Sequence, residues 1–209
     1  MPSKSVALIT TSLRPRRVGI NVAALVQPII EKTLAAADIT LKPVDLRDFN
    51  LPIFNENVVP AMVPEYAQFE HEHSRAWSAE ISKYDGYVLV IPEYNYGVSG
   101  GTKNAIDYLL NEWKGKPLAI VSYGAQGGSK ASAQAKEILA GMGLRVAETR
   151  PQLAFADARA EMGGILAEGK IADASRAKWE GQSGEIVKAA EELKELLLQP
   201  NDEANAPKA

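Results

Sequence analysis

Residues 87–113 read YVLVIPEYNYGVSGGTKNAIDYLLNEW, and this stretch predicts a strand, a loop and a helix in that order. Residues 87–91 form an unbroken apolar and β-branched run, as expected of a strand that is covered on both faces of a parallel sheet. Pro92 has no N–H to donate and is expected to end the strand. In residues 101–113 apolar side chains recur at helical spacing. Loop 93–100 is therefore expected at the carboxyl end of a strand, the edge where open α/β sheets bind ligands.

The rest of the chain repeats this alternation. Further strands are predicted at 5–10, 39–44, 117–122 and 145–149, and further helices at 19–36, 65–83, 130–140 and 175–198. The alternation predicts a single α/β domain over residues 1–200, with a doubly wound, five-stranded parallel sheet and helices on both faces. The flavodoxin-like strand order 2-1-3-4-5 is favoured because it brings the loops after strands one, three and four to one switch point. Residues 201–209 are predicted to be a disordered tail.

The composition excludes several functional classes. The absence of cysteine removes thiolate nucleophiles, disulfides and cysteine-ligated metals, and the net charge of −3 argues against nucleic acid as a partner. No apolar run approaches transmembrane length, and the first residues do not resemble a signal peptide. We therefore expect a cytoplasmic protein that does not bind membranes. His71 and His73 would point to different faces of a helix, so no metal site is expected.

The segment after the first strand is suited to a phosphate group. Ser12 offers a hydroxyl, Arg14 and Arg17 offer guanidinium groups, and the start of a helix at residues 19–21 offers free amides. Helix N-termini and arginine side chains both favour a dianion. The alternative is a solvated basic turn, but the position after the first strand favours phosphate. The fingerprints G-x-G-x-x-G and G-x-x-x-x-G-K-[ST] do not occur, which argues against a Rossmann dinucleotide site or a P-loop.

A different enzyme class is suggested by residues 97–101, GVSGG, which fit the G-x-S-x-G pattern of serine esterases. In that class the serine lies on a tight turn at the strand end, and a histidine follows it in the chain. Here residues 92–96 intervene, and both histidines precede Ser99. Ser99 is therefore interpreted as a helix N-cap, and the esterase is the least favoured of the functions considered.

Three tyrosines lie in predicted loops beside glycines, namely Tyr94, Tyr96 and Tyr123. A lone tyrosine most often serves packing. Three of them in loops at one sheet edge favour contact with a ligand, because loops over a rigid scaffold concentrate binding residues.

The sequence resembles the NADPH-dependent FMN reductase family, flavodoxin-like proteins that include FMN-containing quinone reductases and azoreductases. The resemblance covers about residues 5–150. The matching strings are PEYNYG at 92–97, KNAID at 103–107, GKP at 115–117, SYG at 122–124 with GG at 127–128, and SLRPRRVG at 12–19.

The resemblance implies an FMN-dependent NAD(P)H oxidoreductase. It would pass hydride from NAD(P)H via bound FMN to quinones or similar acceptors, such as free flavin and azo compounds. A flavin held by its phosphate and ring edges would leave one open face for both substrates, so a ping-pong mechanism is expected. The flavin would carry the chemistry, so no catalytic side chain is assigned, although Tyr94, Asn95 and Tyr96 would lie near its ring. A homodimer is implied too, with the helix that ends at Trp113 and the helix that bears Trp77 as candidate interface surfaces.

The resemblance also assigns the cofactor-binding residues to three loops and assigns no metal ligand. The FMN-binding residues implied are Ser12, Arg14, Arg17, Gly19, Ile20, Asn21, Pro92, Glu93, Tyr94, Asn95, Tyr96, Gly97, Ser122, Tyr123, Gly124, Gly127 and Gly128. A second function stays open beside the reductase. It is a flavodoxin-like electron carrier, or a flavin-dependent binding protein, without a substrate of its own.

Overall fold

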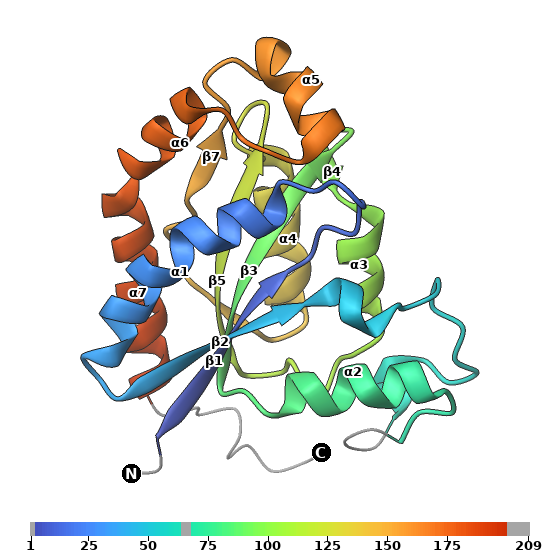
Figure 1. The fold of residues 1–209 in the computed structure, drawn as a ribbon. Coiled ribbons are helices and arrows are strands. Elements are labelled where there is room, and N and C mark those ends of the chain that lie inside the picture. The colour runs from blue at the N-terminus through green and yellow to red at the C-terminus, as the bar shows by residue number, and fades with distance from the viewer. Residues whose placement is uncertain (1–2, 64–67, 200–209) are drawn as a thin grey trace.

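The computed structural model of the protein, which describes residues 3–63 and 68–199, is built on parallel strands (Figure 1). The central strands are β1 (Lys4–Thr10), β2 (Ile39–Asp45), β3 (Gly86–Tyr94) and β5 (Pro117–Gly124). They lie in the order β2-β1-β3-β5, and β6 (Arg145–Val146) follows at the edge. This arrangement confirms the predicted order 2-1-3-4-5. The tail predicted at 201–209 lies outside the described residues.

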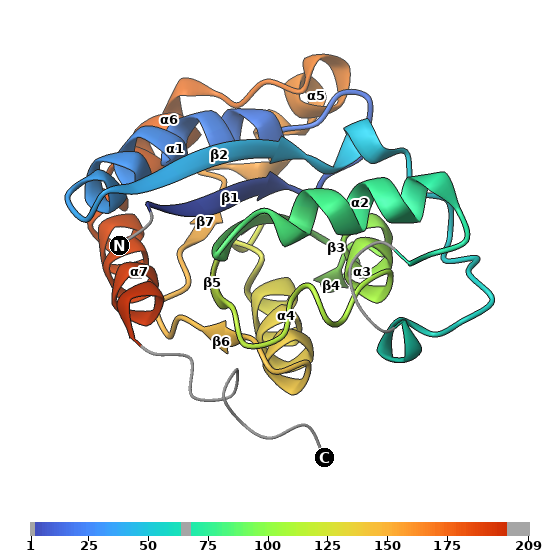
Figure 2. The same ribbon diagram turned by 90° about the horizontal axis from the view of Figure 1, so that it is seen from below.

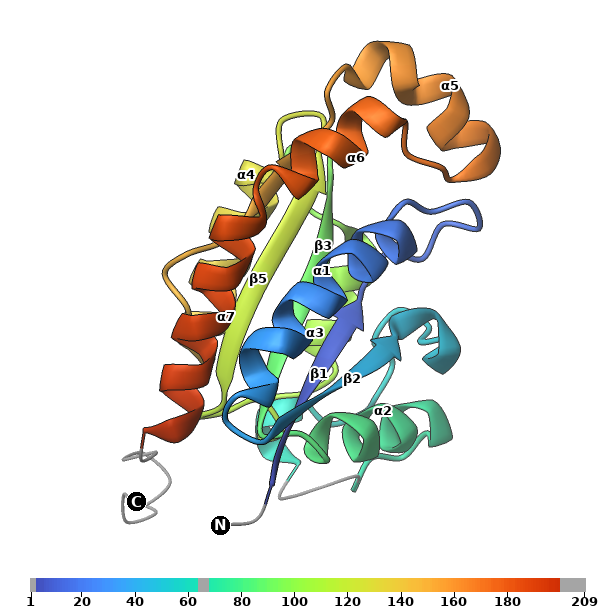
Figure 3. The same ribbon diagram turned by 60° about the vertical axis from the view of Figure 1, so that its left-hand side comes forward.

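Helices cover both faces of the sheet, as predicted (Figures 2 and 3). Alternate residues of β1 point into two different cores, Val6 and Leu8 into one and Ala7 and Ile9 into the other. The first core is covered by α1 (Gly19–Ala35) and α7 (Ser183–Leu198), and the second by α2 (Glu72–Ser82), α3 (Gly100–Asp107) and α4 (Ser129–Gly141).

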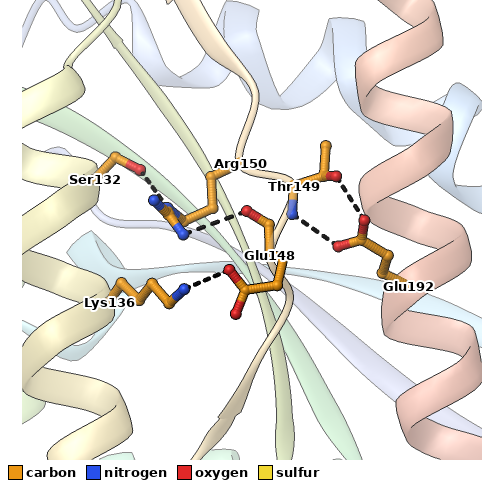
Figure 4. Close-up of polar contacts among 6 residues, drawn as sticks. All are labelled: Ser132, Lys136, Glu148, Thr149, Arg150 and Glu192. Atoms are coloured by element: carbon orange, nitrogen blue, oxygen red, sulfur yellow. Dashed lines mark hydrogen bonds and ion pairs between the residues drawn. The ribbon is translucent and has the colours of Figure 1, made fainter.

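The predicted fifth strand, 145–149, is divided. On the side of β5 away from β3, β6 and the later β7 (Gln152–Ala154) each pair with β5, and the chain leaves the sheet between them. Polar contacts fix this interruption to the helices on both faces (Figure 4). The Thr149 amide and hydroxyl donate to the Glu192 carboxylate of α7 at 2.7 and 2.5 Å, and Arg150 Nε donates to Ser132 Oγ of α4 at 3.2 Å. The strand is interrupted because the Thr149 amide donates to Glu192 and is not available for a hydrogen bond to β5.

Pro92 does not end β3, contrary to the prediction. The strand continues to Tyr94, and Pro92 pairs with Tyr123 of β5. On the other side of β3, the ladder to β1 ends where Thr10 pairs with Val90. Pro92 therefore lies where β3 has a parallel neighbour on one side only, so a missing N–H donor is tolerated.

Several helices differ in length from the prediction. Residues 68–71 are not helical, so α2 begins at Glu72, and α3 ends at Asp107 instead of 113. The predicted C-terminal helix is divided into α6 (Asp173–Glu180) and α7 by a break at Gly181 and Gln182. The weakly patterned region 151–173 holds β7 and α5 (Ala158–Glu168). Short elements complete the described chain, namely η1 (Leu46–Phe49), η2 (Pro60–Met62) and β4 (Gly97–Val98).

Trp77 and Trp113 belong to the core of the protomer. Both are 1% exposed, and their rings lie edge to face at 6.3 Å. The two tryptophans therefore cannot form the contact surface of a dimer, although they mark the chain segments that were expected to provide it. No helix in the described ranges is long and apolar enough to span a membrane.

Candidate functional site

The carboxyl ends of the parallel strands meet at one edge, where the loops after β1, β3 and β5 gather (Figure 1, upper side). The first loop, residues 11–18, carries Ser12, which is 1% exposed. A Cβ at Gly19 would collide with Ser12 Oγ and lie 2.8 Å from the Tyr123 hydroxyl, so only glycine allows α1 to begin this close. Ser12 Oγ has no well-formed hydrogen bond within the described part of the chain, although the Tyr123 hydroxyl lies near it. A buried hydroxyl without a partner is costly, so this atom is suited to a ligand oxygen.

The first turn of α1 is suited to an anion. Its N-cap residue, Val18, has no side chain that could cap the helix. The amides of Asn21 and Val22 donate to Val18 O at 2.8 and 3.1 Å, while those of Gly19 and Ile20 have no acceptor in the described part of the chain. Free amides and the positive end of the helix dipole attract a phosphate.

The two arginines of loop 11–18 have different surroundings. The Arg17 guanidinium is buried, donates to Ser12 O at 2.6 Å and forms a two-point ion pair with Asp45 at the end of β2. Arg14 is half-buried, and within the described residues it makes one hydrogen bond, a long one to Arg16 O at 3.4 Å, and has no carboxylate partner. Arg14 is thus free to meet a ligand, whereas Arg17 already fixes the loop to β2.

The loop after β3 is a tight hairpin. Strand β4 pairs antiparallel with the end of β3, Glu93 with Val98 and Tyr94 with Gly97. The two residues between them, Asn95 and Tyr96, have φ of 49° and 62°. Positive φ at both central positions is the type I′ geometry, which suits asparagine but strains a tyrosine. Tyr96 is 73% exposed, so no packing holds it there, and strain of this kind concentrates at functional sites.

Two side chains fix the hairpin to α4. Glu93 Oε2 accepts hydrogen bonds from the amides of Lys130 and Ala131 at 2.8 and 3.1 Å, and so caps that helix. Gln134 Oε1 accepts from the Val98 amide at 3.1 Å and lies 2.8 Å from where a Cβ on Gly97 would be. The Glu93 carboxylate is therefore used for structure and does not face the ligand edge as a free acid or base.

The loop after β5 folds back on its own strand. Gly127 and Gly128 have φ of 77° and 76°, and a Cβ on Gly128 would lie 3.0 Å from the backbone of Tyr123. Ser122 Oγ donates to Gly127 O at 2.8 Å and closes the turn. Burial raises the pKa of the Tyr123 hydroxyl, so this group stays protonated and can donate a hydrogen bond. Glycine is required here by backbone contact as well as by positive φ.

A chain of hydroxyl groups joins the first loop to α3, and the sequence did not reveal it. Ser99 Oγ lies 2.8 Å from Thr102 Oγ1, which donates to Thr11 Oγ1 at 2.7 Å; Thr11 in turn donates to Val90 O at 3.1 Å. The spacing of Ser99 and Thr102 fits an N-cap, and Ser99 does cap α3. Thr11 carries no sequence signal of this kind, because its partners come from distant parts of the chain.

The arrangement of the histidines does not support an esterase. His71 lies at the N-cap of α2 in an extended conformation, so its ring stacks on His73 at 5.2 Å. The prediction that the two would point to different faces is wrong, because His71 is not yet helical. Their ring nitrogens contact Asn55 and Tyr108, whereas Ser99 is 4% exposed and bonded to Thr102. Ser99 thus lacks a neighbouring base and open access.

Similarity to known proteins now assigns the chain to a family. Residues 5–159 match the family NADPH-dependent FMN reductase. The chain is a member of that family. It is 47% identical over 200 residues to the NAD(P)H-dependent FMN reductase ntnL of Nectria sp, and the alignment covers 94% of this chain and 98% of ntnL. It is 35% identical over 143 residues to a quinone reductase of Pseudomonas putida, covering 65% and 69% of the two chains.

A solved structure agrees with the FMN reductase assignment. FerB, a flavoenzyme NAD(P)H:(acceptor) oxidoreductase from Paracoccus denitrificans, superimposes with a TM-score of 0.61 at 25% identity, over 90% of this chain and 97% of FerB. The free donors of this FMN reductase also fit the cofactor of the family. A phosphate monoester needs several donors at once, and the Ser12 hydroxyl, the first amides of α1 and the Arg14 guanidinium lie on one loop and the helix that follows it.

Proposed function

We propose that this protein transfers hydride from NAD(P)H to quinones and similar small acceptors, free flavins and azo compounds among them. As an FMN reductase it is an NAD(P)H-dependent oxidoreductase with FMN as its cofactor. The observation that carries the proposal is the buried, unpartnered Ser12 hydroxyl beside the uncapped start of α1. A phosphate there would anchor the cofactor at the edge where the ligand loops converge.

Each loop is given a role in this proposal. Ser12 Oγ, Arg14 and the amides of Gly19 and Ile20 would hold the phosphate. Arg17 would mainly position the loop, since Ser12 O and Asp45 engage both of its terminal nitrogens. Its buried Nε is the Arg17 donor that has no partner among the described residues. Asn21 would not bind the phosphate through its backbone amide, because that amide donates to Val18 O at the start of α1. It would instead help to position the residues that do bind the phosphate. The ring would be lined by Pro92, Glu93, Tyr94, Asn95, Tyr96 and Gly97, and by Ser122, Tyr123, Gly124, Gly127 and Gly128.

The protein's own contribution is position and electrostatics. Bound FMN supplies a ring that can accept hydride and donate it again. The backbone of the hairpin after β3 is held rigidly by Glu93 and Gln134, so it can present fixed groups to the ring edge. The N–H groups of the glycine turn and the protonated Tyr123 hydroxyl could donate hydrogen bonds to negative charge on a reduced ring.

NAD(P)H and the acceptor would use the same opening in turn. The loops after β3 and β5 would hold the ring along its edges and would leave one face open, and hydride transfer needs the reacting atoms within about 3.5 Å. NAD(P)⁺ should therefore leave before the quinone enters. Steady-state rates at several fixed quinone concentrations should give parallel double-reciprocal lines. Intersecting lines would contradict the shared opening, and an absence of quinone-dependent NAD(P)H oxidation would favour an electron carrier.

We further propose that the protein is a cytoplasmic homodimer. The support is the family resemblance, and the interface must use surfaces other than the buried rings of Trp77 and Trp113. Sedimentation equilibrium should give twice the mass of the 22.5 kDa chain, and a monomer at micromolar concentration would contradict the dimer.

A further inference from the structure

One segment at the ligand edge has no role in the family assignment. Residues 155–172, which we call the α5 strap, leave β7, form α5 and return to α6. The match to the FMN reductase family ends at residue 159, so most of the strap lies beyond it. In Figures 1 and 3 the strap passes over the start of α1, on the side where the loop after β1 lies.

The strap lies directly against loop 11–18 at Gly169. Gly169, at the end of α5, has a φ of 70°, and a Cβ there would lie 3.0 Å from Arg16 C and 3.1 Å from Arg17 N. Asn21, in the first turn of α1, donates from Nδ2 to Gly169 O at 2.8 Å. The contact is therefore backbone against backbone, and one side-chain hydrogen bond strengthens it. Any residue with a Cβ at position 169 would disturb the contact.

The strap is itself firmly anchored. Ile165 and Ile171 are buried in the core that α1 and α7 share. Ser175 Oγ accepts from the Ala156 amide and donates to Glu161 Oε1, both at 2.7 Å, which joins the two ends of the strap. Trp179 Nε1 donates to Ala154 O at 2.8 Å just before the strap begins. Because the strap is anchored at both ends, it can resist movement of loop 11–18, which it contacts at Gly169.

Loop 11–18 is consequently held from two directions. Arg17 ties the loop to β2 through Asp45. The strap, which leaves β7 at the other border of the sheet, covers the backbone of residues 16 and 17. The same loop carries Ser12 and Arg14, the proposed phosphate ligands. Release of a phosphate held between this loop and α1 requires the loop to move, and that movement must break the contact with Gly169.

We propose that the α5 strap locks loop 11–18 over the FMN phosphate, so that the cofactor stays bound throughout turnover, with Gly169 and Asn21 as positioning residues. The inference rests on the proposed function, because it presupposes that FMN binds at this loop. It adds that contacts outside the phosphate ligands, namely those of Gly169 and Asn21, set how slowly FMN is released.

The test compares two glycine-to-alanine variants from the strap. Gly169→Ala places a methyl group 3.0 Å from the loop backbone at a positive φ and so strains the contact between strap and loop, whereas Gly164→Ala adds a methyl group in α5 with nothing within 4 Å. The FMN-loaded protein is diluted into buffer, and the return of free-flavin fluorescence gives the dissociation rate. We expect about a tenfold faster release from Gly169→Ala and no change from Gly164→Ala. Equal rates in wild type and both variants would overturn the lock.

Asn21→Ala gives a second, independent measurement. If Asn21 acts through Gly169, the double variant with Gly169→Ala releases FMN no faster than the quicker single variant. Multiplying effects would show that Asn21 touches the cofactor itself and would remove it from the lock. Circular dichroism of each apoprotein checks folding. If wild-type apoprotein itself fails to take up FMN, the proposed function fails, and not the role of the strap.

Discussion

Two arginines three residues apart on one loop have different tasks, and the difference lies in their partners. Arg17 has an acidic partner at the end of β2, and Arg14 has none among the described residues. The sequence suggested both as phosphate ligands because composition and spacing do not show which carboxylate folds against which arginine. Asp45 is 28 positions from Arg17, so only the pairing of β1 with β2 brings them together.

Exchange of each arginine for alanine should separate the two tasks. Arg14→Ala should weaken FMN binding by on the order of 1.5–3 kcal/mol, the value of a charge-assisted bond, with little change in stability of the apoprotein. Arg17→Ala should instead lower the free energy of unfolding of the apoprotein, because it leaves Asp45 without its partner. Fluorescence titration with FMN and urea unfolding give the two quantities. An unchanged dissociation constant in Arg14→Ala would identify the loop as a solvated turn.

At the scale of elements, the prediction located nearly every strand and helix but misplaced their ends. β3 continues through Pro92 because β1 has already ended beside it. The end of β3 therefore depends on the neighbouring strand and not on the proline. The fifth strand breaks where Thr149 meets Glu192 of α7. Gly181 and Gln182 divide a region whose apolar spacing suggested one helix. Tertiary partners decide each of these boundaries, and a local pattern does not contain them.

The hairpin after β3 offers a test at the same scale. Tyr96→Gly should relieve a left-handed tyrosine and raise the free energy of unfolding by up to about 1 kcal/mol. Because Tyr96 is proposed to lie near the ring, the same change should raise KM for quinones. Asn95→Gly is the matched control, since asparagine already tolerates positive φ and little stability should be gained. Urea unfolding and steady-state rates decide the matter. A loss of stability in Tyr96→Gly would show that the exposed tyrosine has a packing role.

For the whole molecule, the order of strands, the helices on both faces and the gathering of three loops at one sheet edge could all be predicted. The alternation of strand and helix is visible in the sequence, and the general right-handedness of crossovers turns it into a doubly wound parallel sheet. The strand order followed from the expectation that three loops meet at one switch point. The α5 strap could not. Its helix buries Ile165 alone, carries two adjacent glycines and keeps Met162 and Leu166 exposed, so apolar spacing gives almost no helical signal. Its place over the first loop depends on the contact of Gly169 with residues 16 and 17.

The interruption of the fifth strand has a further consequence for the protein in a crowded solution. An open sheet exposes unpaired backbone groups along its border, which can recruit a strand from another molecule. At one border here, the two- and three-residue strands β6 and β7 are too short to serve as such a template. At the other border, β2 exposes Lys42 and Pro43, a charge and a residue without an N–H. Both borders are therefore unfavourable for fibrillar self-association. The border at β6 and β7 has interrupted strands, and the border at β2 carries an exposed charge and a proline.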